Sequence, residues 1–193
     1  MRIVLVALAA GLCVLAVLRL SADESSDHVN RVERKDGRSM VSSSGYDLTR
    51  LSDERIAELA KDLKPDERQI LLEKGTERPF CGGLLDNKEE GVYTCRLCGL
   101  PLFSSDSKFH SGTGWPSFFK PFDPDHVHEE RDTSHWMVRT EITCERCGSH
   151  LGHVFDDGPR PTGLRYCLNG AALKFYKEGS ALPSESQPAL ATA

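Results

Sequence analysis

The sequence predicts a mainly β domain with an antiparallel core and two short helices packed on its outside. From Gly91 onward, short β-type stretches alternate with Gly, Pro and Asp, which is typical of antiparallel strands joined by long loops. Apolar residues at helical spacing occur just before that point. We expect strands at 92–94, 136–143 and 164–168.

Length and composition indicate one soluble globular domain with extra ends. The chain has 193 residues, of which 39% are hydrophobic and 27% are charged. Lys and Arg number 24 against 29 Asp and Glu, so the formal net charge is -5. The broad electropositive surface of a nucleic-acid-binding protein is therefore not expected.

The N-terminal residues form a separate unit with the pattern of a targeting segment. An uninterrupted apolar run covers residues 3–18, between Arg2 and Arg19, and Ser21 and Ala22 follow it. This pattern predicts either a secretory signal peptide or a short membrane anchor over residues 1–22, because a buried core helix would show a polar face. We therefore expect a secretory, periplasmic or other extracytoplasmic location. Cys13 is interpreted as a small apolar residue of this segment.

The remaining boundaries follow from composition. Residues 23–47 are rich in Ser and charged residues without an apolar period, which predicts a flexible linker. Residues 179–193 contain two prolines and no apolar period, which predicts a disordered tail. The folded domain is therefore expected at 48–178.

Two helices are predicted at the start of this domain. Ser52 suits the N-cap of the first helix, whose apolar residues keep helical spacing until Pro65. Pro65 suits the first position of a second helix, with Asp66 and Glu67 at its positive end. Gly75 is expected to be its left-handed C-cap.

A repeat with a shift of 49 positions gives the strongest internal signal. Two CxxC pairs, each followed by Gly, recur after β-type segments, and the pairs are Cys95 with Cys98 and Cys144 with Cys147. Two such tight turns can supply the tetrahedral four-thiolate shell of one structural Zn²⁺, with no position left for a substrate. The alternative is a pair of CxxC disulfides or redox motifs, although a thioredoxin-type motif would open a helix.

Cys167 is the candidate nucleophile. In an extended strand, Arg165, Cys167 and Asn169 share one face, and a neighbouring cation favours the thiolate form. An amide can orient the group that is attacked. This segment taken alone fits a buried, inert cysteine equally well.

Two further segments supply groups for such a site. Residues 149–155 add the imidazoles of His150 and His153, although a single histidine in a sequence is more often structural. Residues 112–118 form a Gly-rich aromatic loop, in which Trp115 can provide an apolar wall.

Together these segments resemble the B-type methionine sulfoxide reductases, which are specific for the R epimer. The resemblance covers residues 46–176 and rests on the two CxxC turns and on residues 75–80, 111–118, 150–155 and 165–169. It implies a β fold of two antiparallel sheets. It also implies that the protein reduces methionine sulfoxide, either free or in oxidised proteins.

The resemblance also assigns roles to individual residues. Cys167 attacks the sulfoxide sulfur and becomes a sulfenic acid, while His153, helped by His150, lies near the oxygen. Trp115 is our candidate for the wall that holds the substrate methyl group, and Phe155 is predicted to contact the substrate.

A second thiol is needed to resolve the sulfenic acid. Residues 104–119, where many family members carry this cysteine, contain none, so Cys81 is the remaining candidate in the domain. The alternative is that Cys81 is a small buried turn residue. A Cys81–Cys167 disulfide would be reduced by thioredoxin or a thioredoxin-like partner.

Two functions of other classes fit parts of the pattern. A zinc-ribbon binding module explains the CxxC pairs but leaves Cys167 and the two histidines without a task. A thiol-disulfide oxidoreductase would use Cys81 and Cys167 and would not act on the sulfoxide. Nothing in the sequence suggests a coiled coil, so a monomer is expected.

Overall fold

The computed structural model describes residues 40–189. The predicted signal or anchor segment at 1–22, with Cys13, lies outside these residues, as do most of the predicted linker and the last four residues of the predicted tail. Within 40–189, no helix is long and apolar enough to cross a membrane.

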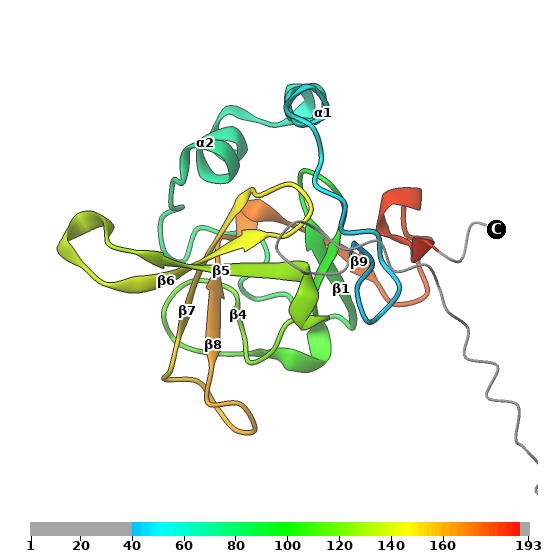
Figure 1. Ribbon diagram of the computed structural model, residues 1–193. Coiled ribbons are helices and arrows are strands. Elements are labelled where there is room, and N and C mark those ends of the chain that lie inside the picture. Colours follow the sequence, from blue (N-terminus) through cyan, green and yellow to red (C-terminus); the bar gives the residue numbers. More distant parts are fainter. Residues whose placement is uncertain (1–39, 190–193) are drawn as a thin grey trace, which may run out of the picture. The chain divides into compact units, whose positions relative to one another are not determined.

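The two predicted helices are present and lie outside the sheets (Figure 1). Helix α1 covers Asp53–Leu59 and continues as the 3-10 turn Ala60–Asp62, and the Ser52 side chain caps it by accepting a hydrogen bond from the Arg55 amide. Helix α2 covers Pro65–Glu73. Its left-handed cap is Lys74, with φ 55°, so the prediction of Gly75 was wrong. Gly75 is the residue after this cap, and its amide donates a hydrogen bond to the Gln69 carbonyl.

The β structure divides into two antiparallel sheets, as expected. The smaller sheet has the order β2-β1-β9, with β1 at Gly91–Cys95, β2 at Pro101–Ser104 and β9 at Leu173–Lys177. The larger sheet has the order β3-β4-β8-β7-β6-β5. Its strands are β3 Lys108–Phe109, β4 Ser117–Phe118, β5 Val127–Asp132, β6 Arg139–Cys144, β7 His150–Phe155 and β8 Arg165–Leu168.

Short 3-10 turns connect these strands. One of them, Ser134–Trp136, joins β5 to β6, so the strand predicted to begin at Trp136 begins at Arg139. Trp136 has φ 60°, which is incompatible with an extended strand. The other turns after α2 are Ser105–Ser107, Pro124–His126, Gly170–Ala172 and Ser184–Ser186.

The core combines side chains of both sheets. Tyr93 of β1, Phe103 of β2 and Phe118 of β4 are fully buried. The Phe118 ring stacks on Phe103 at a centroid distance of 4.7 Å and meets Tyr93 edge-on at 5.0 Å. Burial of each such side chain stabilises the fold by roughly 1.5 to 3 kcal/mol. These rings fix the smaller sheet against the larger one.

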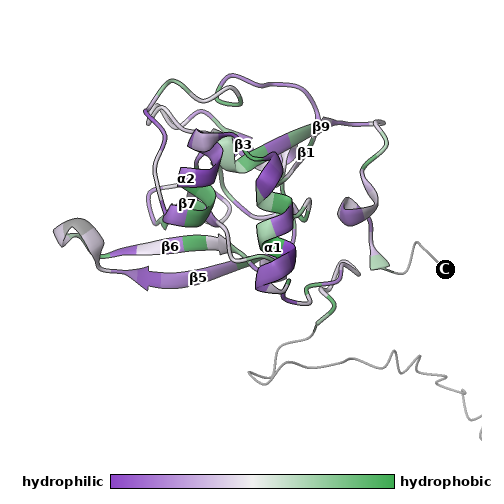
Figure 2. Cartoon of the chain, turned by 90° about the horizontal axis from the view of Figure 1, so that it is seen from above, coloured by the Kyte–Doolittle hydropathy of each residue, from purple (hydrophilic) through white to green (hydrophobic). Residues whose placement is uncertain are grey.

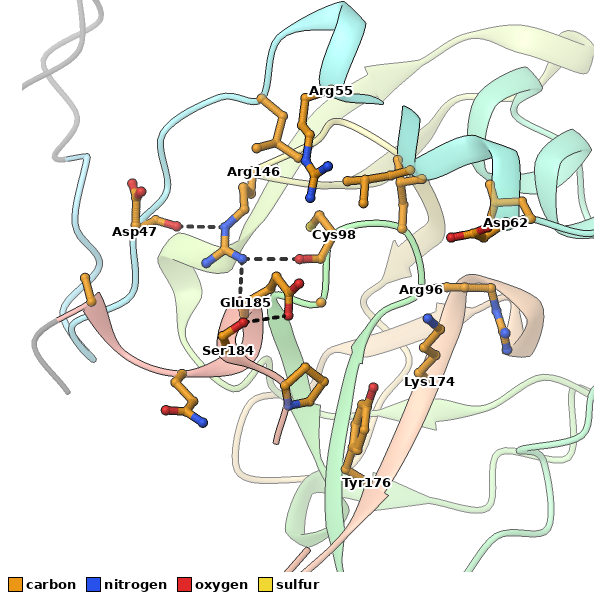
Figure 3. A pocket seen from close by; sticks show the side chains of 18 of the residues that line it. Asp47, Arg55, Asp62, Arg96, Cys98, Arg146, Lys174, Tyr176, Ser184 and Glu185 are labelled. Atoms are coloured by element: carbon orange, nitrogen blue, oxygen red, sulfur yellow. Dashed lines mark hydrogen bonds between the residues drawn. The ribbon is translucent and has the colours of Figure 1, made fainter. Parts of the chain in front are cut away.

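The folded part extends beyond the predicted boundaries at 48 and 178. Tyr46 lies in the core, and Ser186 is fully buried and donates a hydrogen bond to the Gly99 carbonyl. Arg146 joins both ends to the body of the domain. Its guanidinium donates to the carbonyls of Asp47 and Glu185, as Figure 3 shows. Composition did not indicate this because the contacts are to backbone oxygens.

Candidate active site and metal centre

Cys167 lies in a row of side chains that crosses the larger sheet. Antiparallel pairing places His153 of β7 directly opposite Cys167 of β8, and Ser117 of β4 directly opposite it on the other side. Residues that face each other in this way have side chains on the same face of the sheet. The predicted nucleophile and His153 are therefore neighbours, and Cys167 is partly accessible to solvent.

A β-bulge brings His150 to the same site. Residues three apart in a regular strand point to opposite faces, but the register between β6 and β7 shifts at Ile142 and Thr143. As a result, the imidazoles of His150 and His153 lie 5.5 Å apart. Gly152 is required here, because a Cβ at this position would lie 2.1 Å from the Cys167 carbonyl oxygen.

Each histidine has a carboxylate partner that the sequence analysis did not identify. His150 Nδ1 lies 2.7 Å from Glu141 Oε1, and His153 Nε2 lies 2.8 Å from Asp132 Oδ2. Burial is the main cause of a lowered His150 pKa, which makes this ring neutral at neutral pH, so its Nδ1–H donates a hydrogen bond to the Glu141 carboxylate. Lys74 holds the other oxygen of Glu141 at 2.7 Å. Only the folded sheet brings these groups together.

A chain of hydroxyl groups approaches the Cys167 sulfur from the loop before β4. The Thr113 hydroxyl lies 3.8 Å from Cys167 Sγ and 2.8 Å from the Ser111 hydroxyl. Ser117 donates to Ser111 at 2.7 Å. Burial raises the pKa of Cys167, and the hydroxyls of Thr113 and Ser117 act in the opposite direction. The two hydroxyls therefore favour the thiolate form of Cys167, whereas burial favours the neutral thiol.

Arg165 also favours the thiolate, the direction predicted from sequence, but burial of Cys167 outweighs its effect. Its guanidinium binds both oxygens of Asp157 at 2.8 Å and covers the Phe155 ring at 4.3 Å. The positive charge lowers the pKa of Cys167, yet burial has the larger effect and the net pKa is raised. Arg165, Phe155 and Cys167 are thus brought together, with the guanidinium fixed by the exposed Asp157.

Asn169 and Trp115 meet at Glu77. The Asn169 side chain accepts a hydrogen bond from the Glu77 amide at 3.0 Å and donates one to the Leu151 carbonyl at 3.2 Å. The Trp115 indole donates to the Glu77 carbonyl at 3.2 Å. The Glu77 carboxylate in turn accepts from the amides of residues 170 and 171. Glu77 therefore fixes both the indole and the end of β8.

Cys81 lies on the loop that follows Glu77, and its side chain is exposed, so it is not a small buried residue. It lines a hollow with Gly170, which closely follows β8. The preceding residue, Phe80, donates a backbone hydrogen bond to Gly114 in the Thr113 loop. Cys81 and Cys167 are both free thiols, and they lie on segments that contact the same loop.

The four CxxC cysteines form one buried cluster. Their sulfur atoms all lie within 4.8 Å of one another, and the Sγ–Sγ distances are 3.6 Å from Cys95 to Cys147 and 3.5 Å from Cys98 to Cys144. A tetrahedral site with Zn–S bonds of about 2.3 Å requires sulfur atoms about 3.8 Å apart. The cluster therefore has the donor set and the dimensions to bind a metal ion.

The sequence repeat is also a repeat of geometry. In the first turn, the Gly99 amide donates to the Cys95 carbonyl, and in the second turn the Gly148 amide donates to the Cys144 carbonyl. Gly99 and Gly148 have φ of 74° and 70°, the left-handed conformation that glycine adopts without strain. One turn joins β1 to β2 and the other joins β6 to β7, so each sheet supplies two thiols.

A cavity of about 670 Å³ lies at a different place, beside α1 and the first CxxC turn (Figure 3). Its lining includes Arg55, Arg146, Lys174 and Glu185, but not Cys167 or either histidine. The cavity therefore carries none of the nucleophilic chemistry described above.

Comparison with known proteins agrees with this geometry. A family model described as the SelR domain matches residues 63–177. The chain belongs to the SelR family. Curated relatives named peptide methionine sulfoxide reductase MsrB include one from Xylella fastidiosa strain M23, which is 57% identical over 140 residues, or 72% of this chain and 90% of the relative.

Other SelR relatives are equally similar. The protein of the same name from Caulobacter vibrioides strain NA1000 is 57% identical over 143 residues, which cover 74% of this chain and 90% of the relative. The one from Methanosarcina barkeri is 59% identical over 121 residues, or 63% of this chain and 85% of the relative. The family resemblance stated from sequence is thereby confirmed.

Within the SelR domain, the groups that support the named residues were not predicted from sequence. Thr113 and Glu77 stand inside the motifs at 111–118 and 75–80, where a hydroxyl or a carboxylate is a signal of such a role. Asp132 and Glu141 gave no such signal, because their contacts with the histidines depend on strand register and on the bulge in β7.

Proposed function

We propose that this protein reduces the R epimer of methionine sulfoxide, free or within oxidised proteins, to methionine. The observation that carries the proposal is the pairing of Cys167 with His153 on neighbouring strands. Membership of the SelR family and the names of the relatives support the same reaction.

In the first step, the Cys167 thiolate attacks the sulfur of the sulfoxide. Protonation of the oxygen weakens the S–O bond of the substrate, and the ring of His153, held by Asp132, is suited to supply the proton. The protonated oxygen passes from the substrate sulfur to the Cys167 sulfur as the substrate S–O bond breaks, so methionine departs with its sulfur reduced and Cys167 is left as a sulfenic acid. His150 acts as a neutral neighbour that holds His153 in place.

Trp115 provides the wall for the methyl group of the substrate. Its indole is half-buried and is fixed by the hydrogen bond to the Glu77 carbonyl. A site that fixes the methyl group at Trp115 and the oxygen at His153 leaves one approach for Cys167. The opposite epimer would place its oxygen against the indole, so the R epimer is preferred. Phe155 and Arg165 complete the surroundings of the substrate, and Asn169 acts through Glu77, whose segment holds the indole.

In the second step, the Cys81 thiol attacks the sulfenic acid. A disulfide forms between Cys81 and Cys167, and water leaves with the oxygen. A dithiol of thioredoxin or of a thioredoxin-like protein then exchanges with the disulfide and restores both thiols. The exposure of Cys81 and its loop contact with Gly114 support this role, because the thiol lies on a segment beside the Thr113 loop.

The four-cysteine cluster holds one structural Zn²⁺ in our proposal. Cys95, Cys98, Cys144 and Cys147 supply all four ligands, so the ion stabilises the fold and has no position for a substrate. We further propose that the protein is a monomer. Export through residues 1–22, as signal peptide or anchor, would place the domain outside the cytoplasm.

One assay tests the reaction. The purified protein is incubated with dithiothreitol and separated R and S epimers of a blocked methionine sulfoxide, and methionine is measured. We expect methionine from the R epimer and none from a Cys167→Ser variant, because a hydroxyl is a far poorer nucleophile than a thiolate. Equal rates with both epimers, or turnover by the variant, would contradict the proposal.

A further inference from the structure

The turn between β5 and β6 presents apolar side chains to solvent. Trp136 is fully exposed, Val138 is 68% exposed and Met137 is 46% exposed. The hairpin that carries them projects from the rest of the domain in both Figure 1 and Figure 2. Single exposed apolar residues are ordinary on protein surfaces, but a group of three consecutive ones at a projecting tip indicates a contact surface.

Trp136 is unfavourable for stability in two respects. Its φ of 60° is a conformation that bulky residues adopt at a cost, and its ring gains no burial in return. The turn is nevertheless well defined by hydrogen bonds. The Ser134 amide donates to Asp132 Oδ1 at 2.8 Å, and the Met137 amide donates to the Ser134 carbonyl at 3.1 Å. Folding therefore does not explain the tryptophan, whereas contact with a partner does.

The turn is connected directly to the active site. Asp132, whose Oδ1 holds the turn, accepts hydrogen bonds at Oδ2 from His153 at 2.8 Å and from Arg139 at 2.6 Å. One carboxylate thus joins the base of the turn to the histidine opposite Cys167. A partner bound at the tip would therefore contact the turn whose base is tied through Asp132 to the histidine opposite Cys167.

A second exposed aromatic residue lies on the other side of Cys167. Phe80 is 67% exposed, has φ 63° and packs against Gly114 in the Thr113 loop. In the strand order of the sheet, β8 lies between β4, which follows this loop, and the β5–β6 hairpin. In the strand order, the strand of the thiol therefore lies between the loop that Phe80 contacts and the hairpin that carries Trp136, and both aromatic residues are exposed and in left-handed conformations.

We propose that residues 136–138 dock the apolar residues that flank an oxidised methionine in a substrate protein. This inference rests on the proposed function. Oxidation turns a buried methionine into a polar group and disrupts the packing around it, so its apolar neighbours become exposed together with the sulfoxide. On β5 the exposed charged residues are Glu129 and Glu130 against Arg131, and this net negative charge disfavours an anionic membrane surface as the partner and suits a segment that also carries basic residues.

Two oxidised peptides of equal length test the inference. Each carries one central R-sulfoxide, flanked in one peptide by Leu and Phe and in the other by Ser and Gly. Trp136→Ser should lower kcat/KM for the apolar peptide by roughly tenfold, and the change should appear in KM. A tenfold change is near the low end of the effect expected when burial of a large apolar side chain is lost. The polar peptide and the free blocked sulfoxide should be reduced at the parent rate.

Two further variants separate contact from folding. Trp136→Phe keeps an apolar ring and should retain most of the preference for the apolar peptide. Trp136→Gly should lose the preference as Trp136→Ser does, yet raise Tm, because glycine tolerates the left-handed φ. Equal losses on both peptides, or no loss on either, would overturn the inference.

The parent protein distinguishes this failure from failure of the proposed reaction. If the parent does not reduce even the free R-sulfoxide, the proposed function itself is wrong. A membrane role is tested with vesicles of phosphatidylcholine. One outcome would overturn the docking of substrate and assign the turn to a membrane surface. In that outcome, Trp136→Ser abolishes vesicle binding but reduces both peptides at the parent rate.

Discussion

His153 faces Cys167 directly across strands β7 and β8, while its Nε2 is held 2.8 Å from Asp132 of the edge strand β5. In the strand order, the histidine is thus fixed from the β5 edge, whereas the Thr113 loop precedes β4 on the other side of β8. Its orientation depends on a carboxylate that is two strands away in the sheet order.

The first prediction concerns this carboxylate. Asp132→Asn should lower kcat with the free R-sulfoxide by roughly tenfold to a hundredfold, because the orienting partner of the histidine that we propose as the acid is lost. The alkylation rate of Cys167 by iodoacetamide should stay close to that of the parent, since Asp132 does not contact the sulfur. Unchanged kcat would show that His153 does not depend on Asp132.

The second prediction concerns the hydroxyl 3.8 Å from the reacting sulfur. Thr113→Val removes a donor that lowers the pKa of Cys167, so this pKa should rise further above its usual value. The pH profile of alkylation should move to higher pH by about one to two units, the range expected for one hydrogen bond to a charged group. Thr113→Ser is the matched control and should keep the parent profile.

The third prediction divides the work of the two thiols. Cys81→Ser should release close to one methionine per enzyme in a single turnover, because Cys167 is intact. Its cycling with thioredoxin should be slow, whereas dithiothreitol should restore turnover by reducing the sulfenic acid. Cycling with thioredoxin at the parent rate would show that Cys167 is regenerated without Cys81.

The fourth prediction concerns the metal. Purified protein should contain close to one Zn²⁺ per chain, and Cys98→Ser should lose it and fail to fold. The free energy of binding structural zinc, about 10 to 16 kcal/mol in small domains, is as large as the whole stability of a typical domain. Elemental analysis and circular dichroism measure both effects. Cys81→Ser is the control, and it should keep the metal, while folded protein with little metal would contradict the assignment.

The fifth prediction concerns acid stability. His126 is fully buried, with Nδ1 2.6 Å from the Pro101 carbonyl and Nε2 2.9 Å from the Ser42 hydroxyl, and burial is the main cause of its lowered pKa. Below about pH 6.5 the unfolded chain binds a proton at this ring before the folded protein does, so stability falls with falling pH.

This slope can be measured by urea denaturation between pH 7.5 and 5.5. His126→Gln should make the slope shallower by at most about 1.4 kcal/mol per pH unit, the value for one proton. A slope should remain, because the pKa of His150 is lowered as well. An unchanged slope would show that His126 does not bind the proton in this range.

The sequence predicted local features well. Ser52 caps α1 and Pro65 opens α2 as expected, since capping depends on a few neighbouring residues. The 49-residue repeat predicted the four-cysteine cluster, because two identical turns present their thiols in the same way. Gly75 failed as the cap of α2, since the helix ends one residue earlier and Lys74 takes the left-handed conformation.

Contacts between strands could not be predicted from the sequence. Strand alternation alone places His150 and His153 on opposite faces, and only the bulge at Ile142 and Thr143 reverses this. The net rise in the pKa of Cys167 depends on how deeply its sulfur lies, which Arg165 as a sequence neighbour did not reveal. The structured ends beside Arg146 depend on hydrogen bonds to carbonyl groups, which every residue type offers.

The six described cysteines differ in exposure, and this difference decides which thiols an oxidant reaches first. The four cluster thiols are at most 5% exposed, whereas Cys81 and Cys167 meet solvent. Peroxide that reaches the protein therefore encounters Cys81 and Cys167, whose oxidation the proposed cycle reverses, before it reaches the four cysteines of the proposed metal site. On the proposed function, the domain can keep reducing methionine sulfoxide under the conditions that form it.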